Sequence, residues 1–126
     1  MAADGTDDKL DGGSPITQTA PTYAEVENLC KALFEQTIGT EKYDHLEGVK
    51  WNKQLVESIA QGLVGMSRPF KYCVSCIIME VGVASGVGLN VASTCFWDKQ
   101  TDASYSIRCE TKNVLAVCTI FAVNYV

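Results

Sequence analysis

Several kinds of residue are scarce in this chain of 126 residues, and each scarcity excludes a class of function. With His45 as its only histidine, the chain cannot build a histidine-rich metal site, and a Ser-His-Asp or Cys-His mechanism would depend on this one residue. Ten Lys and Arg against fifteen Asp and Glu give a net charge of −5, which disfavours binding to nucleic acid or anionic membranes. No apolar run approaches the ~20 residues of a membrane span. The composition, 47% hydrophobic and 20% charged, is that of one globular domain.

The first 21 residues differ in character from the rest. They combine several aspartates with Gly, Ser, Thr and Pro and show almost no hydrophobic periodicity, so residues 1–21 are expected to be a disordered acidic tail, followed by one domain over residues 22–126. The segment lacks the basic start and apolar centre of a secretory signal. We therefore expect an intracellular, cytoplasmic protein whose cysteines are mostly free. These are Cys30, Cys73, Cys76, Cys95, Cys109 and Cys118.

Two amphipathic helices are predicted at the start of the domain. Thr22 and Glu25 form a capping-box pattern, and apolar residues then recur at helical spacing up to Gly39, a typical left-handed stop. A second helix is expected to start near Asp44 or Gly48 and to end at Arg68-Pro69, because the residue before proline avoids the helical region. Its apolar stripe comprises Trp51, Leu55, Ile59, Leu63 and Met66.

Four strands are predicted in the second half, over residues 70–81, 89–97, 103–110 and 114–125, with Gly, Asp or Asn near the end of each. The third alternates cleanly between apolar and polar residues, as a half-buried strand does. The first and fourth are apolar on both faces, and Phe70 is expected on the same face of the first strand as Cys73. Two helices can cover only one face of an antiparallel sheet. A second copy of the chain is the simplest cover for the other face.

Four local features carry ordinary structural interpretations. Cys73 and Cys76 spell CxxC, but residues three apart on a strand point to opposite faces, so a shared metal or mutual disulfide is not expected. The glycines of 82–88 fit neither phosphate-binding motif and predict a flexible connection. Asp98 and Asp102 are typical of a turn, rather than of a carboxylate pair for acid/base chemistry. His45, beside a helix start, is expected to be a solvated or capping residue.

The order of these elements and several short strings together resemble the Tctex-type dynein light chains. The resemblance covers roughly residues 22–126. The strings are IG at 38–39, W at 51, LVE at 55–57, RPFKY at 68–72, CIIM at 76–79, ASTCFWD at 92–98 and TDASYSIR at 101–108. Three features depart from the family pattern: a slightly longer 82–88 connection, Cys109 in place of an aromatic residue, and the end AVNYV.

The resemblance implies an α+β fold with two N-terminal helices packed on a four-stranded antiparallel sheet in a strand-exchanged homodimer. It implies that the strand at 89–97 crosses to the partner copy. It further implies no catalytic residue, cofactor or metal, and a non-catalytic dynein light chain, cytoplasmic or ciliary, that binds dynein intermediate-chain segments by β-strand addition and links cargo adaptors to the motor. The alternative is a small cytosolic thiol or redox protein using the CxxC at 73–76. The candidate partner-binding residues are Phe70, Tyr72, Asn90, Ala92, Thr94 and Phe96.

Overall fold

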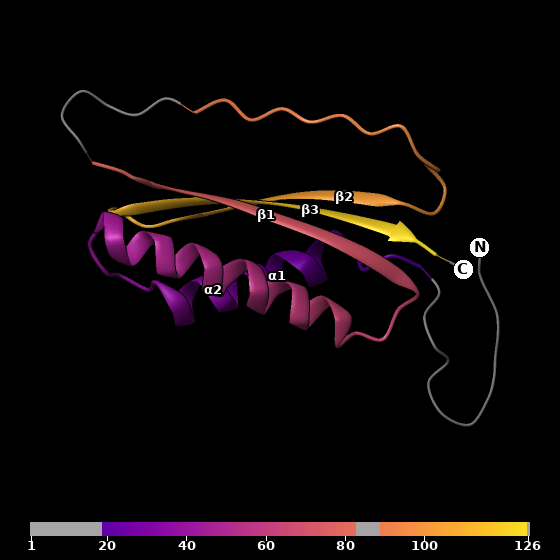
Figure 1. Ribbon diagram of the computed structural model, residues 1–126, viewed down its shortest axis with the longest axis horizontal. Coiled ribbons are helices and arrows are strands. Elements are labelled where there is room, and N and C mark those ends of the chain that lie inside the picture. Colours follow the sequence, from indigo (N-terminus) through magenta and orange to yellow (C-terminus); the bar gives the residue numbers. More distant parts are fainter. Residues whose placement is uncertain (1–18, 83–88, 126) are drawn as a thin grey trace.

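The computed structural model describes residues 19–82 and 89–125. Two helices, α1 (Tyr23–Thr37) and α2 (His45–Val64), precede three strands, β1 (Phe70–Glu80), β2 (Ala103–Glu110) and β3 (Val114–Asn124). The helices lie side by side against one face of the sheet, and the chain around residue 90 runs along the other face (Figure 1). The fold is therefore α+β, with one sheet face covered by helices.

The start and end of α1 follow from its sequence. The Thr22 side chain accepts from the Glu25 backbone N–H, and the Glu25 carboxylate accepts from the Thr22 N–H at 2.8 Å, which completes the predicted capping box. At the other end Gly39 has φ of +59° and donates its N–H to the Phe34 carbonyl. The predicted limits of this helix are confirmed.

Asp44 is the N-cap of α2, and its carboxylate accepts from the Leu46 and Glu47 N–H groups. The predicted stripe is confirmed at its four helical positions, Trp51, Leu55, Ile59 and Leu63, which are all buried. The helix ends at Val64, Met66 lies beyond it, and the chain turns through Ser67, with φ of +57°, before it reaches Arg68-Pro69.

The sheet is antiparallel with the order β1-β3-β2, so the last strand of the chain lies in the centre. In its register Cys76 pairs with Cys118, and Ile107 pairs with that same Cys118 from the other side. Central β3 is the most buried strand because it has a neighbour on each edge and helices on one face.

The core lies between the helices and the face of the sheet that they cover. Val26, Leu55 and Ile59 from the helices meet Ile107 and Ile120 from the sheet, all with no exposed surface. Polar contacts connect the start of α1 to the rest of the domain. Arg68, just before β1, pairs with Glu25 of α1 at 2.9 Å, and the Tyr105 hydroxyl of β2 donates to the Pro21 carbonyl at 2.7 Å. The domain is thus held by apolar packing in the middle and by hydrogen bonds at the rim.

Two sequence predictions differ from the structure. Residues 89–97 are extended but have no partner strand among the described residues, so the single chain forms three of the four expected strands. A strand requires a neighbour for its backbone groups, and the described part of the chain places none beside the segment. Phe70 was assigned to the wrong face: it is 5% exposed, and its ring lies 6.5 Å from that of Tyr72 on the helix side.

Most of the expected acidic tail, 1–21, and most of the glycine connection, 82–88, fall outside the described residues. Within the described residues, no helix has the length and apolar character needed to cross a membrane.

Candidate interaction surface

The face of the sheet turned away from the helices, here called the outer face, has a mixed character. Its centre is apolar and its β2 side is polar. Cross-strand pairs on it include Ile77 with Val117 and Met79 with Leu115. The members of the outer face are Lys71, Cys73, Ser75, Ile77, Met79, Ser104, Ser106, Arg108, Glu110, Leu115, Val117, Thr119, Phe121 and Val123.

Apolar side chains of this face remain accessible to solvent. Ile77 is 43% exposed and Val123 is 38% exposed, although both belong to regular strands. Leu115 and Val117 are shielded, since each has a strand neighbour on both sides. An apolar strip with exposed members on a small domain is a feature of association surfaces.

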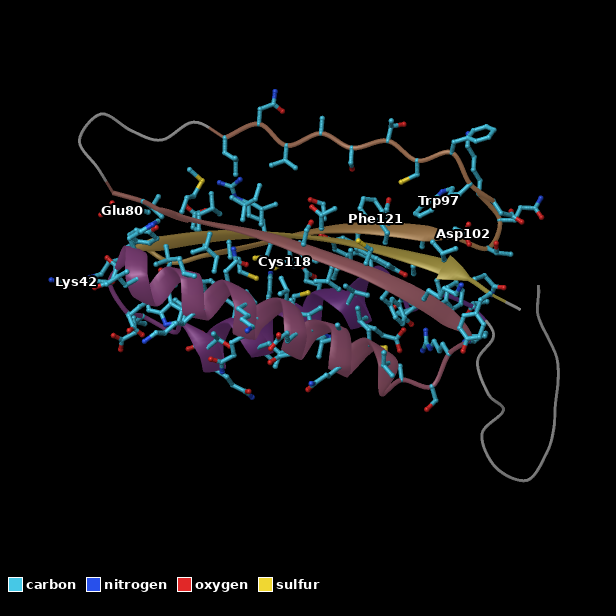
Figure 2. All side chains as sticks on the ribbon, viewed as in Figure 1. Lys42, Glu80, Trp97, Asp102, Cys118 and Phe121 are labelled. Atoms are coloured by element: carbon cyan, nitrogen blue, oxygen red, sulfur yellow. The ribbon has the colours of Figure 1, made fainter. Side chains whose placement is uncertain are left out.

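The segment 89–97 runs over this outer face as an extended chain (Figure 1). It brings further exposed apolar side chains, with Leu89 at 40%, Val91 at 42% and Phe96 fully exposed. Trp97 anchors its end, because the indole meets the Phe121 ring edge-on at 5.9 Å between centroids (Figure 2). The segment therefore presents both its backbone and several apolar groups.

The turn that follows the segment is fixed by aspartates, as predicted. Asp98 accepts from the Gln100 N–H at 2.9 Å, and its own N–H donates to Asp102 Oδ2 at 3.2 Å. Asp102 Oδ1 accepts from the Asn124 N–H at 2.8 Å, which joins the turn to the end of β3. These carboxylates are hydrogen-bond acceptors of the turn.

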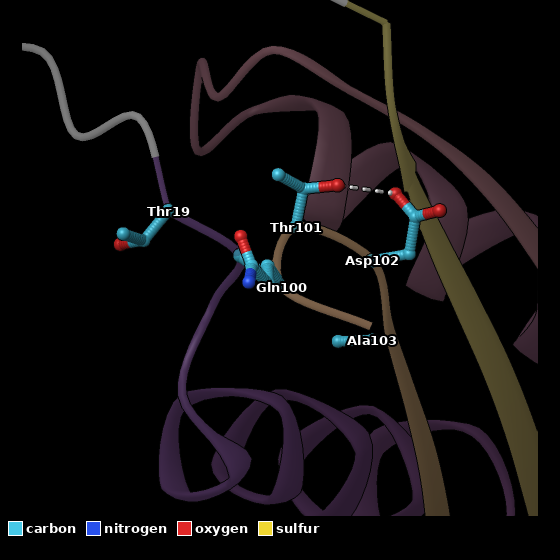
Figure 3. Close-up of a pocket in the computed structure, with 6 residues that line it drawn as sticks. Thr19, Gln100, Thr101, Asp102 and Ala103 are labelled. Atoms are coloured by element: carbon cyan, nitrogen blue, oxygen red, sulfur yellow. Dashed lines mark hydrogen bonds between the residues drawn. The ribbon is translucent and has the colours of Figure 1, made fainter. Parts of the chain in front are cut away.

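A pocket of about 320 Å³ lies between this turn and the chain that leads into α1 (Figure 3). The Thr101 hydroxyl there donates to Asp102 at 3.2 Å, so the carboxylate is already engaged. Apart from the Gln100 amide, short side chains supply the rest of the wall, and the pocket offers a ligand few anchoring groups. Its lining is Thr19, Ala20, Gln100, Thr101, Asp102 and Ala103.

The predicted partner-binding residues divide into two groups. Phe70 and Tyr72 lie on the helix side of the sheet, where Phe70 is buried and Tyr72 is partly buried. The others belong to the extended segment on the opposite side of the sheet and are exposed. One chain does not bring the two groups together. The second group comprises Asn90, Ala92, Thr94 and Phe96.

Tyr72 has a further property that its sequence position did not reveal. Its hydroxyl is buried and has no hydrogen-bond partner within residues 19–82 and 89–125, and burial raises the pKa of this phenol. Tyr105 shares the burial effect, which raises its pKa to about 12, but it donates to a backbone carbonyl. Both hydroxyls are therefore neutral over the physiological range.

The two cysteines of the CxxC pattern diverge as predicted. Cys73 is exposed on the outer face, whereas Cys76 faces the helices and lies 3.3 Å from Cys118, sulfur to sulfur. All six cysteines are free. No cluster of three or more His, Cys, Asp or Glu within residues 19–82 and 89–125 is arranged to hold a metal ion.

The thiols on the helix side form a shielded group. The hydrogen bond with Cys118, and then burial, raise the pKa of Cys30 and of Cys76, and burial raises the pKa of Cys109 to about 11. Hydrogen bonds from Cys30 and Cys76 lower the pKa of Cys118 against the effect of burial, but its side chain is only 1% exposed. Thiol-redox enzymes need an accessible low-pKa thiolate, and this group lacks that combination.

His45 is the first residue of α2 and is exposed, with its Nδ1 atom 3.1 Å from the Tyr43 hydroxyl. No carboxylate or nucleophile is paired with it among the contacts of the described residues. The arrangement matches the structural interpretation of this residue from the sequence.

Together these elements define a small α+β domain with one sheet face covered by helices and an extended segment over the other. A model of the Tctex-1 family matches residues 22–123, and the chain belongs to that family. It is 34% identical over 97 residues to the dynein light chain Tctex-type of Drosophila melanogaster, covering 77% of this chain and 85% of that protein. It is 29% identical to the human dynein light chain Tctex-type 3 and 26% identical to a Dictyostelium discoideum dynein light chain Tctex-type, with coverage of 79% and 77% of this chain and 83% and 86% of the relatives.

Proposed function

We propose that this chain is a non-catalytic dynein light chain that works as a homodimer and binds extended segments of the dynein intermediate chain. Membership of the Tctex-1 family and relatives named as dynein light chains support the class. The observation that carries the binding mode is the extended segment 89–97, which has no partner strand among the described residues and lies above the apolar centre of the outer face.

In the proposed homodimer each copy contributes its 89–97 segment to the sheet of the other. This exchange would supply the fourth strand that one chain lacks. Each backbone hydrogen bond gained contributes ~0.5–1.5 kcal/mol net, so a ladder of several bonds is favourable without any change inside the folded domain. The exposed Leu89 and Val91 would be buried in the same step.

An intermediate-chain segment would then add beside the exchanged strand. Backbone pairing would provide affinity, and the side chains at Asn90, Ala92, Thr94 and Phe96 would provide selectivity, since they share one face of the segment. A single short peptide is expected to bind with micromolar affinity. Two tethered peptides would bind far more tightly because the second event is intramolecular.

The proposed role includes linking cargo adaptors to a motor associated with the cytoskeleton, in the cytoplasm or in cilia. It excludes a catalytic step and a required cofactor. The redox alternative has weaker support because Cys73 and Cys76 lie on opposite faces of β1.

Light scattering on a sizing column tests the homodimer, with an expected mass about twice 13.7 kDa. A monomer at micromolar concentration would contradict the exchange. Affinity purification of the tagged protein should recover dynein intermediate and heavy chains.

Calorimetry with intermediate-chain peptides tests the binding face. Ala92→Arg and Thr94→Arg are expected to weaken peptide binding at least tenfold, because bulky charges would occupy the proposed site. Lys53→Glu is the matched control, since Lys53 is exposed on α2 in the helical layer. A persistent dimer with unchanged affinity in both arginine variants would place the site elsewhere.

A further inference from the structure

The contact between Cys76 and Cys118 has the geometry of a bridgeable pair. The residues are direct partners in the β1-β3 register, and their sulfur atoms lie 3.3 Å apart. Directly opposed residues on antiparallel strands have Cα atoms about 4.5–5.5 Å apart, within the range of about 4.4–6.8 Å found in disulfides. A bond between them would need little movement of the backbone.

The two thiols differ in access and in their neighbours. Cys76 is only partly buried, so a small reagent has a route to it, whereas Cys118 is almost completely buried. Cys30, on α1, also lowers the pKa of Cys118. Cys118 thus has partly exposed Cys76 on one side and fully buried Cys30 on the other.

We propose that Cys76 and Cys118 form an oxidisable dithiol that hydrogen peroxide converts to a disulfide between β1 and β3. The Cys76 thiol gives up its proton as its sulfur attacks one peroxide oxygen; the O–O bond breaks, and the departing hydroxide takes up that proton, so that Cys76 sulfenic acid and water are the products. The Cys118 thiolate then attacks the Cys76 sulfur, the S–O bond breaks, and the hydroxyl leaves as water with one proton. Two thiols lose two electrons and two protons in total, and one peroxide is reduced to two water molecules.

The bond would close the chain between residues 76 and 118, the part that contains the extended segment and β2. It lies on the helix side of the sheet, away from the outer face. Oxidation is therefore expected to stabilise the domain and to leave the oligomeric state unchanged. This inference does not depend on the proposed binding function.

The test treats the reduced full-length Cys73→Ala chain with a small excess of hydrogen peroxide, because this variant removes the exposed thiol that could link two molecules. Remaining thiols are then alkylated, and the protein is cleaved at Met79 and with trypsin. We expect a loss of two hydrogens, one linked peptide pair containing Cys76 and Cys118, and a melting temperature raised by roughly 5–15 °C.

Cys76→Ala in the same background should abolish the linked pair and the rise in melting temperature, and Cys30→Ala should retain both. The same mapping on wild-type protein needs no core substitution, so it decides the question if a variant fails to fold. Overoxidation of Cys76 without a bridge, or a bridge that joins Cys118 to Cys30, would overturn the proposal.

Discussion

The indole ring of Trp97 meets the ring of Phe121 edge-on, with 5.9 Å between centroids and an interplanar angle of 72°. Trp97 is the last residue of the extended segment, and Phe121 belongs to central β3. This contact therefore joins a segment that is not part of the sheet to the most buried strand. Aromatic pairs in this geometry contribute beyond the area that they bury.

A double-mutant cycle with Trp97→Ala and Phe121→Ala should therefore give a coupling free energy of ~0.5–1.5 kcal/mol. The measurement is urea unfolding of the wild type, the two single variants and the double variant. Strict additivity would mean that the rings do not stabilise each other in solution.

Two glycines near helix ends should respond differently to substitution by alanine. Gly39→Ala is expected to lower the free energy of unfolding by ~1–2 kcal/mol, because Gly39 has φ of +59° and an added Cβ would lie 3.3 Å from the Glu35 carbonyl oxygen. Gly65→Ala is the matched control, since Gly65 has helical φ of −63° and an added Cβ makes only ordinary contacts. Equal effects in thermal melts would contradict the left-handed stop.

The contacts of Glu25 at the start of α1 should make the free energy of unfolding fall at acid pH. The hydrogen bond from the Thr22 N–H is the largest effect that holds the pKa of Glu25 below its ordinary value of 4.5; burial opposes it, and the Arg68 guanidinium lowers the pKa further. A depressed pKa in the folded state means that the stabilisation is complete above pH 4.5 and is lost as the pH falls through the lower folded value. Glu25→Gln should thus lower stability at pH 7 by no more than ~1 kcal/mol, because solvent screens the exposed carboxylate.

Stability curves for wild type and Glu25→Gln between pH 2 and pH 7 check this expectation, and they should converge at the acid end. A constant gap across the range would show that charge does not carry the effect.

Two isoleucines on opposite sides of the sheet should separate core packing from surface exposure. Ile120→Ala is expected to cost ~2–5 kcal/mol, because Ile120 is fully buried against the helices. Ile77→Ala on the outer face should cost less than ~1 kcal/mol within the folded chain, since Ile77 is 43% exposed. Chemical denaturation measures both, and a large cost for Ile77→Ala that depends on protein concentration would locate it in a subunit interface.

Much of the fold was predictable because its signals are local. The capping box at Thr22, the stop at Gly39 and the apolar stripe from Trp51 to Leu63 each depend on residues within a few turns of one helix. The order β1-β3-β2 was not predictable, because strand neighbours far apart in the sequence are chosen by the packing of the whole domain.

Less of the candidate site could be predicted from the sequence. Alternation in residues 89–97 predicts an extended chain, but a ladder also requires a neighbouring strand, and no sequence pattern states where that neighbour lies. The contact between Cys76 and Cys118 was not predictable for the same reason. The sequence places both residues on strands, but it does not give the register between β1 and β3. Phe70 and Tyr72 are two residues apart, so strict alternation along β1 places both side chains on the same face.

The Asp102 carboxylate receives the Asp98 N–H with one oxygen and the Asn124 N–H with the other. A single side chain thus acts as a clamp between the end of the extended segment and the end of the central strand. These hydrogen bonds lie within one chain, so the direction of the segment at this end is set without a partner molecule. One residue inserted between Trp97 and Asp98 would exchange the two faces of the segment, turning Phe96 inward, and would alter the shape of any assembly without touching the core.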